Sequence, residues 1–286
     1  MWGRHRAPGI AVGRIALAGV LFSGVIAAPC TEARAGAWTQ KEGGASAFLQ
    51  TTATWSSQAF DGAGNLFANR SYDKVSTQLF LEYGASDWLT LLAAPELLQI
   101  QVGAGEPGAV DGASSRYSGF GYTDVGARVR LGAGDGWMTS AQAVLRIPGA
   151  NPSEGLAALG YVDAEVDLRL MAGLAFTLFG LPAFLDLEAA QRVREGAPPD
   201  EFRFDATLGV RVAPDWLLLA QSFNVISEGA GQGPVFDVSY AYYKVQFGGM
   251  YDVTPHLSFM LAGVTTWYAR NAIQENGIVG AMLVRY

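Results

Sequence analysis

The chain has 286 residues, half of them apolar and few of them charged, with a net charge of −7 at neutral pH. This negative charge argues against nucleic acid as a partner, because phosphate backbones are held by basic surfaces. The composition alone does not separate a soluble β-protein from a membrane protein.

Residues 1–35 have the three parts of a secretory signal. A basic start is followed by an apolar run from Ile15 to Ala28, and Ala33-Arg34-Ala35 supplies a small-x-small cleavage site. We therefore expect a signal peptide over 1–35 and a mature chain over 36–286. The signal carries a net charge of +3, so the mature chain carries −7 − 3 = −10.

The only cysteine, Cys30, lies within this expected signal. A lipid anchor on Cys30 is disfavoured, because Pro29 stands where such cleavage sites require a small residue. The mature chain is then expected to have no disulfide and to depend on backbone pairing and packing.

Alternating runs of polar and apolar residues begin soon after the cleavage site. In KVSTQLFLEYG, Lys74 and Glu82 share one face, while Val75, Leu81 and Tyr83 share the other. This is the periodicity of a β-strand. Twelve such runs can be counted, which suits strands of about 9–11 residues.

The connections between these runs alternate in length along the chain. Long polar connections such as FDGAGNLFANRS and PGANPSEGLAALG alternate with short turns such as ASDW, GAGDGW, APDW and DVTPH. The alternation places both ends of the mature chain on the side of the short turns. It is typical of an up-and-down barrel with short turns on one side of a membrane and longer loops on the other.

The segment from Leu170 to Leu185 contains no charge and could be mistaken for a transmembrane helix. It is shorter than the ~20 residues that a spanning helix needs. Gly173, Gly180 and Pro182 interrupt it, so we expect two strand ends around a turn.

The charged residues fall on one parity within most runs, and the opposite parity is nearly all apolar. In the run from Glu201, for example, Glu201, Arg203 and Asp205 alternate with Phe202 and Phe204. A secreted soluble sandwich would also alternate. The asymmetric turn lengths, and the aromatic residues that follow short turns, favour a membrane barrel.

The sequence therefore predicts an all-β fold: a transmembrane antiparallel up-and-down barrel of about twelve strands in the outer membrane of a Gram-negative bacterium. Closure is required, because an open sheet edge in lipid would leave backbone groups unpaired. The expected partners are outer-membrane lipid, the barrel-assembly machinery through the C-terminal strand, and an unidentified small solute. An interfacial aromatic girdle is expected at Trp88, Trp137, Trp216 and Tyr286.

The charged parity is expected to line the interior of the barrel. The candidate lumen-lining residues are Lys74, Glu82, Asp124, Arg128, Arg130, Arg146, Asp163, Glu165, Asp167, Arg169, Asp186, Glu188, Arg192, Glu201, Arg203, Asp205 and Arg211. They create a transverse field that orients polar or anionic solutes, or they form cross-strand ion pairs that plug the interior. The pattern is compatible with both interpretations.

Four segments carry a family resemblance: GYTDVGARVRL, APDWLLLAQSFNVI, YAYYKVQFGGMYDVTPHLS and NAIQENGIVGAMLVRY. Together they resemble outer-membrane proteins described as similar to a meta-pathway phenol-degradation porin or transporter. The resemblance covers essentially the whole mature chain. It implies a bacterial outer-membrane barrel with a role in small-molecule passage, and it supplies no residue of known chemical role.

Signals of catalysis or metal binding are weak. His256, in a short turn, is the only histidine of the mature chain, and no GxSxG elbow occurs. Zinc is disfavoured because one histidine without cysteine cannot make the usual ligand set. The segment Asp61–Asn65 could offer oxygen ligands but lacks the spacing of a calcium loop. We expect no enzyme activity, no metal and no cofactor.

The leading functional hypothesis is a channel or transporter-like barrel that passes small polar or aromatic-acid solutes through a narrow charged lumen. One alternative is a structural or assembly barrel with a plugged lumen, and a more remote one is an outer-membrane hydrolase. Whether Trp38–Gly44 lies inside the barrel as a small plug is left open by the sequence.

Overall fold

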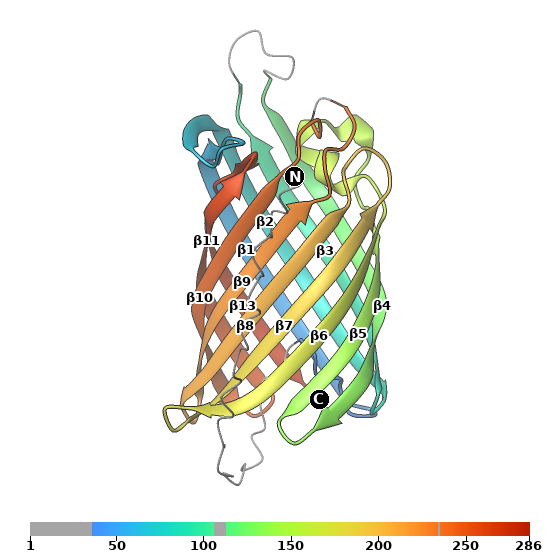
Figure 1. The fold of residues 1–286 in the computed structure, drawn as a ribbon, viewed down its shortest axis with the longest axis vertical. Helices are drawn as coiled ribbons and strands as arrows, with labels where there is room; N and C mark the ends of the chain where they lie inside the picture. Colours follow the sequence, from blue (N-terminus) through green and yellow to red (C-terminus); the bar gives the residue numbers. More distant parts are fainter. Residues whose placement is uncertain (1–35, 106–112, 234) are drawn as a thin grey trace, which may run out of the picture. The chain divides into compact units, whose positions relative to one another are not determined.

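The computed structural model describes residues 36–105, 113–233 and 235–286. The expected signal peptide, residues 1–35, lies outside the described residues. The described residues belong to a unit that is separate from Met1–Ala33. They form a β-barrel (Figure 1).

Eleven long strands follow one another along the chain, and two further strands complete the sheet. They are β1 (Ala45–Phe60), β2 (Leu66–Ser86), β3 (Leu89–Val102), β4 (Ser115–Gly134), β5 (Trp137–Ile147), β6 (Glu165–Leu178), β7 (Leu181–Arg194), β8 (Glu201–Ala213), β9 (Trp216–Ser227), β10 (Ala241–Thr254), β11 (Leu257–Arg270), β12 (Ala272–Ile273) and β13 (Asn276–Arg285).

Each long strand pairs antiparallel with the next one in the chain, and β13 pairs with both β11 and β1. The two-residue strand β12 also pairs with β1, so β12 and β13 together form one barrel strand. The sheet therefore closes on itself as twelve antiparallel strands, which confirms the predicted fold class. No pair of edges is left open, as a membrane barrel requires.

Short turns and longer connections alternate as expected. Leu170–Leu185 forms the end of β6 and the start of β7, and the turn between them places Phe179 and Gly180 at φ angles of 50° and 81°. Two successive positive φ values are typical of a type I′ hairpin turn. Within the described ranges, the helices are all too short or too polar to cross a bilayer.

One expected long connection is largely strand. The segment FDGAGNLFANRS was expected to be a loop, but β1 and β2 stay paired out to Phe60 and Leu66. The Asp61 carboxylate accepts hydrogen bonds from the backbone N–H groups of Asn65 and Ala63, at 2.8 and 2.9 Å. These bonds lower the pKa of Asp61, with that from Asn65 contributing most. Such an aspartate cap stabilises a tight turn, which lets the strands continue.

The outward face of the barrel is apolar. Leu170, Phe247 and Leu261 are among its most exposed side chains, and Leu261 is 70% exposed. Large apolar side chains in such numbers would be costly in water, and they suit a surface covered by lipid. The fold is that of a transmembrane β-barrel of the outer membrane.

The longest described connection, between β5 and β6, contains two short 3₁₀ helices, η1 (Pro152–Glu154) and η2 (Leu156–Tyr161). Ala157 and Ala158 of η2 are buried against inward side chains of β3, among them Leu98 and Ile100. We call residues 148–164 the inner loop. It was expected only as a polar loop, and its apolar contacts hold it against the barrel wall.

Candidate functional site

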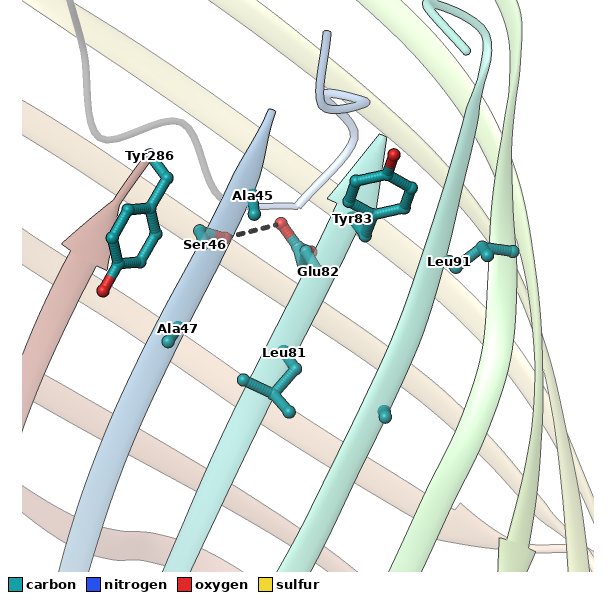
Figure 2. Close-up of a pocket in the computed structure, with 9 residues that line it drawn as sticks. Ala45, Ser46, Ala47, Leu81, Glu82, Tyr83, Leu91 and Tyr286 are labelled. Carbon is teal, nitrogen blue, oxygen red and sulfur yellow. Dashed lines mark hydrogen bonds between the residues drawn. The ribbon is translucent and has the colours of Figure 1, made fainter. Parts of the chain in front are cut away.

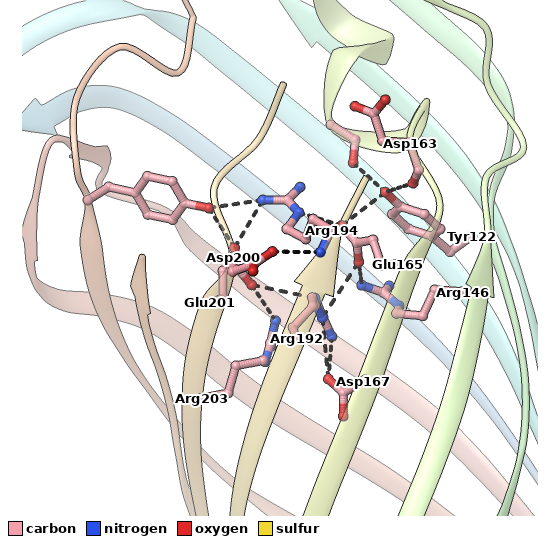
Figure 3. Close-up of polar contacts among 12 residues, drawn as sticks. Tyr122, Arg146, Asp163, Glu165, Asp167, Arg192, Arg194, Asp200, Glu201 and Arg203 are labelled. Carbon is pink, nitrogen blue, oxygen red and sulfur yellow. Dashed lines mark hydrogen bonds and ion pairs between the residues drawn. The ribbon is translucent and has the colours of Figure 1, made fainter. Parts of the chain in front are cut away.

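One part of the inner wall is densely charged. On β4 to β8, cross-strand pairing sets Arg146 opposite Glu165, and Glu165 opposite Arg194. The Glu165 side chain is 1% exposed, and its oxygens lie 2.6 Å from Nη1 of Arg146 and 2.7 Å from Nε of Arg194. Figure 3 shows these groups converging inside the barrel. Opposed charges on neighbouring strands stabilise the pairing of those strands.

A second row of ion pairs lies deeper, toward the short turns. Arg192 Nη2 lies 3.0 Å from Asp167 Oδ2, and Arg169 Nη1 lies 3.0 Å from Asp205 Oδ2. Arg169 also pairs with Glu188. We call the inward side chains of β4–β8 the charged wall. Because most of its charges are paired, much of its field is internally compensated.

The opposite part of the inner wall is largely neutral. The inward positions of β9, β11 and β13 follow from their pairing with charged or buried inward residues. Arg285, at the short-turn end of β13, is charged, and its Nη1 donates to Ser258 Oγ at 3.1 Å. The other inward residues of these strands are uncharged: Leu217, Leu219, Gln221, Phe223, Val225, Ser227, Ser258, Met260, Ala262, Val264, Thr266, Gly277, Val279, Ala281 and Leu283. We call this surface the neutral wall.

Two lysines meet at Glu275, which lies next to β13. Lys244 of β10 contacts the Glu275 carboxylate, and Lys74 of β2 lies 3.7 Å from it. Thr54 Oγ1 donates to Glu275 Oε1 at 3.1 Å. Sequence reasoning missed Glu275 because it was assigned to a connection. The only sequence feature that pointed to a role for Glu275 was its position as a single acidic residue beside the last strand.

The neutral wall is continued by two phenylalanines on β1 and β2. Phe48 and Phe80 lie opposite each other, with ring centroids 6.3 Å apart. Phe80 shares the inward parity of Lys74 and Glu82, yet it is 37% exposed. An inward side chain keeps that much exposure only where the barrel encloses accessible space.

The contacts of the segment before β1 show whether it lies inside the barrel. The backbone N–H of Ala37 donates to Asp186 Oδ2 at 2.8 Å, and Arg128 Nη1 donates to the carbonyl of Trp38 at 3.0 Å. The Trp38 ring packs edge-on against Phe184. Since these partners are inward residues of β4 and β7, residues 36–44, which we call the inner segment, lie inside the barrel near the short turns.

Most predicted site residues on the strands are brought together in these networks. Arg128 pairs with Glu82 at 3.0 Å, and Arg211 pairs with Asp252 at 2.9 Å. Asp163 was expected within a strand but precedes β6, where its carbonyl accepts the Tyr122 hydroxyl at 2.9 Å. Burial raises the pKa of the Asp163 carboxyl. That these residues line a pathway for solutes stays a prediction.

Sequence reasoning also missed the inward apolar residues of β3. Leu98, Ile100 and Val102 are buried beneath the inner loop. The signal was that LTLLAAPELLQIQ carries leucine and isoleucine on both parities. A strand whose inner face is also apolar needs an apolar partner inside the barrel.

The four girdle candidates lie at the short-turn end with exposed side chains. Near Tyr286 the outer wall has a depression of about 330 Å³, lined chiefly by apolar residues of β1, β2 and β3. Figure 2 shows Tyr83 and Tyr286 flanking the small residues Ala45 and Ala47. A girdle role for these aromatic residues remains a prediction, supported by their exposure.

His256 is exposed in the turn between β10 and β11, and its Nδ1 lies 3.0 Å from the carbonyl oxygen of Arg285. This contact joins the turn to the last strand and engages no serine hydroxyl. Over the described ranges, no cluster of three or more histidine, cysteine, aspartate or glutamate side chains is arranged to hold a metal ion.

No protein-family model matches the chain, and no curated protein matches its sequence. Among solved structures, the COG4313 outer membrane channel from Pseudomonas putida F1 is similar, with a TM-score of 0.69 and 15% identity over 87% of this chain and 98% of that chain. The transport unit of the autotransporter AIDA-I from Escherichia coli has a TM-score of 0.52 and 11% identity, over 84% and 90% of the two chains. At such identities the similarity establishes the fold alone, that of an outer-membrane β-barrel.

Proposed function

We propose that this barrel passes small polar or aromatic-acid solutes across the outer membrane, along the space between the charged wall and the neutral wall. The single observation that carries the proposal is the exposed inward face of Phe80, which requires accessible space inside the barrel. Paired charges on one side and aromatic or aliphatic side chains on the other suit a solute with one anionic and one apolar end.

The border between the walls offers both kinds of contact. Arg203 of the charged wall lies opposite Val225, which in turn lies opposite Tyr242. Within the described residues, the buried Nε of Arg203 has no hydrogen-bond partner, while its Nη1 lies 3.3 Å from Glu201. An incompletely satisfied guanidinium beside apolar side chains is suited to attract a carboxylate that carries a ring.

Single-channel recording of refolded residues 36–286 in a planar bilayer tests this proposal. We expect steady conductance, interrupted more strongly by added benzoate than by acetate at equal concentration. Acetate carries the same charge without a ring, so it isolates the contribution of the neutral wall. Equal effects of the two anions would remove the aromatic-acid part of the proposal, and the absence of conductance in folded protein would overturn it entirely.

The inner loop and the inner segment favour one alternative, a structural or assembly barrel with a plugged lumen. The inner loop covers inward residues of β3, and the inner segment occupies the interior near the short turns. If this alternative holds, neutralising Arg203 and Asp205 together lowers stability and leaves permeability unchanged. A change in ion selectivity in that double variant would contradict it.

A further inference from the structure

Asp186 differs from the other acids of the charged wall. Its side chain is buried, with 3% of the residue exposed, yet within the described residues it has no lysine or arginine as an ion-pair partner. Its carboxylate accepts a 2.8 Å hydrogen bond from the Ala37 N–H. A buried carboxylate without a cation is costly, so Asp186 must either bind a proton or have a positive group close by.

Gly36 lies directly against this carboxylate. A Cβ placed on Gly36 would fall 2.1 Å from both Cγ and Oδ1 of Asp186, and the φ angle of Gly36 is 81°. No residue with a side chain fits that approach. From standard bond lengths, the backbone nitrogen of Gly36 is within about 5 Å of Oδ1.

Gly36 is also the first residue after the expected cleavage site Ala33-Arg34-Ala35. In the uncut chain the Gly36 nitrogen is a neutral amide. Hydrolysis of the Ala35–Gly36 peptide bond adds one water, leaves a carboxylate on Ala35 and turns the Gly36 nitrogen into a protonated α-amino group.

We propose that cleavage between Ala35 and Gly36 creates the missing counter-ion of Asp186, so that the new α-ammonium group fixes the inner segment inside the barrel. The remaining contacts of the segment hold it in register for this pairing. Arg128 binds the Trp38 carbonyl, and the Gln40 N–H donates to Thr90 Oγ1 at 2.8 Å. The proposal does not depend on whether the lumen conducts.

The test uses full-length precursor expressed in a Gram-negative host and barrel purified from its outer membranes. Intact mass and N-terminal sequencing should show a chain that begins at Gly36. The folded barrel is then treated at neutral pH with an amine-acylating ester, and the acylation of the α-amino group is followed by peptide mapping. Pairing with Asp186 keeps this amine protonated and unreactive.

We expect Asp186→Asn to accelerate α-amine acylation at least tenfold. Asp215→Asn is the matched control, because it removes the same charge from an exposed turn at the same end of the barrel and should leave the rate unchanged. If Asp186→Asn fails to assemble, Gly36→Ala replaces it, since the added methyl group displaces the terminus from Asp186. A chain that begins elsewhere, or an unchanged acylation rate in the variant that folds, would overturn the proposal.

Discussion

The charged wall and the neutral wall are parts of the same sheet, yet different interactions hold their inner faces. On β4–β8, a single carboxylate such as that of Glu165 forms ion pairs with several arginines. On β9, β11 and β13, inward residues such as Leu219 and Met260 need no partner of opposite charge. The charged wall is consequently sensitive to the loss of a single group, whereas the neutral wall tolerates substitutions that preserve volume.

The largest expected effect is on the stability of the charged wall. Glu165→Gln keeps the shape of the side chain but leaves Arg146, Arg192 and Arg194 without a shared carboxylate. We expect the free energy of unfolding to fall by about 3–5 kcal/mol, as for other broken buried ion pairs. Urea titration of the refolded barrel, followed by tryptophan fluorescence, measures it.

Met260→Leu is the control on the neutral wall, where a volume-conserving change should cost less than about 1.5 kcal/mol. An equal decrease in the free energy of unfolding of Glu165→Gln and Met260→Leu would contradict the distinction between the two walls.

A smaller stability effect, with a clear functional readout, is expected at Arg203. Arg203→Gln leaves Glu201 paired with Arg194 at 3.3 Å, so the loss should be about 1.5–3 kcal/mol. Removal of one inward positive charge should lower the permeability to anions relative to cations, measured as a shift in reversal potential across a KCl gradient. Lys41→Gln changes the same charge on the exposed part of the inner segment and should shift the potential less.

A substitution on the neutral wall should change the preference for aromatic over non-aromatic anions more than it changes the stability of the barrel. Phe223→Ala removes a ring that pairs across the strands with Asp205 on one side and Lys244 on the other. Because Phe223 is only partly buried, the cost should be about 1–2 kcal/mol, below that of a fully buried side chain. The difference between benzoate and acetate block should shrink. An unchanged difference would place aromatic recognition elsewhere, with Phe80→Ala as the next variant.

The smallest effect is expected at Asp61, which lies beyond both walls and serves as a baseline. Its pKa is lowered in the folded hairpin, so its stabilising contribution is present above the unfolded pKa of 3.8 and is lost as pH falls through the lower folded value. Hydrogen exchange of the amides of Ala63 and Asn65 should therefore accelerate below about pH 4, after correction for intrinsic rates. Asp61→Asn should abolish this pH dependence while keeping part of the cap.

The barrel architecture and the charged parity could be predicted because polar and apolar side chains alternate along most strands with a period of two residues. Lys74, Glu82 and the Glu201–Asp205 run show it directly. The strand count followed from the number of alternating runs. The expected signal peptide and the assembly machinery as a partner stay predictions.

The parts that could not be predicted depend on contacts between distant segments. The inner loop packs on Leu98 and Ile100, and no local pattern indicates which wall a loop of small residues will meet. Glu275 pairs with Lys74 from the other end of the chain. The strands are longer than predicted because an aspartate cap, as at Asp61, lets a hairpin continue beyond the length that is needed to span the bilayer.

The closing pair of the barrel also determines the order in which the molecule can form. Ser46 of β1 pairs with Arg285 of β13, residues separated by 285 − 46 = 239 positions. Every other neighbouring pair of long strands is joined by a hairpin or a local loop, but this contact is made only after nearly the whole mature sequence has emerged. Closure over such a separation is expected to be the slow step of folding, and until it occurs β1 and β13 both present unpaired edges.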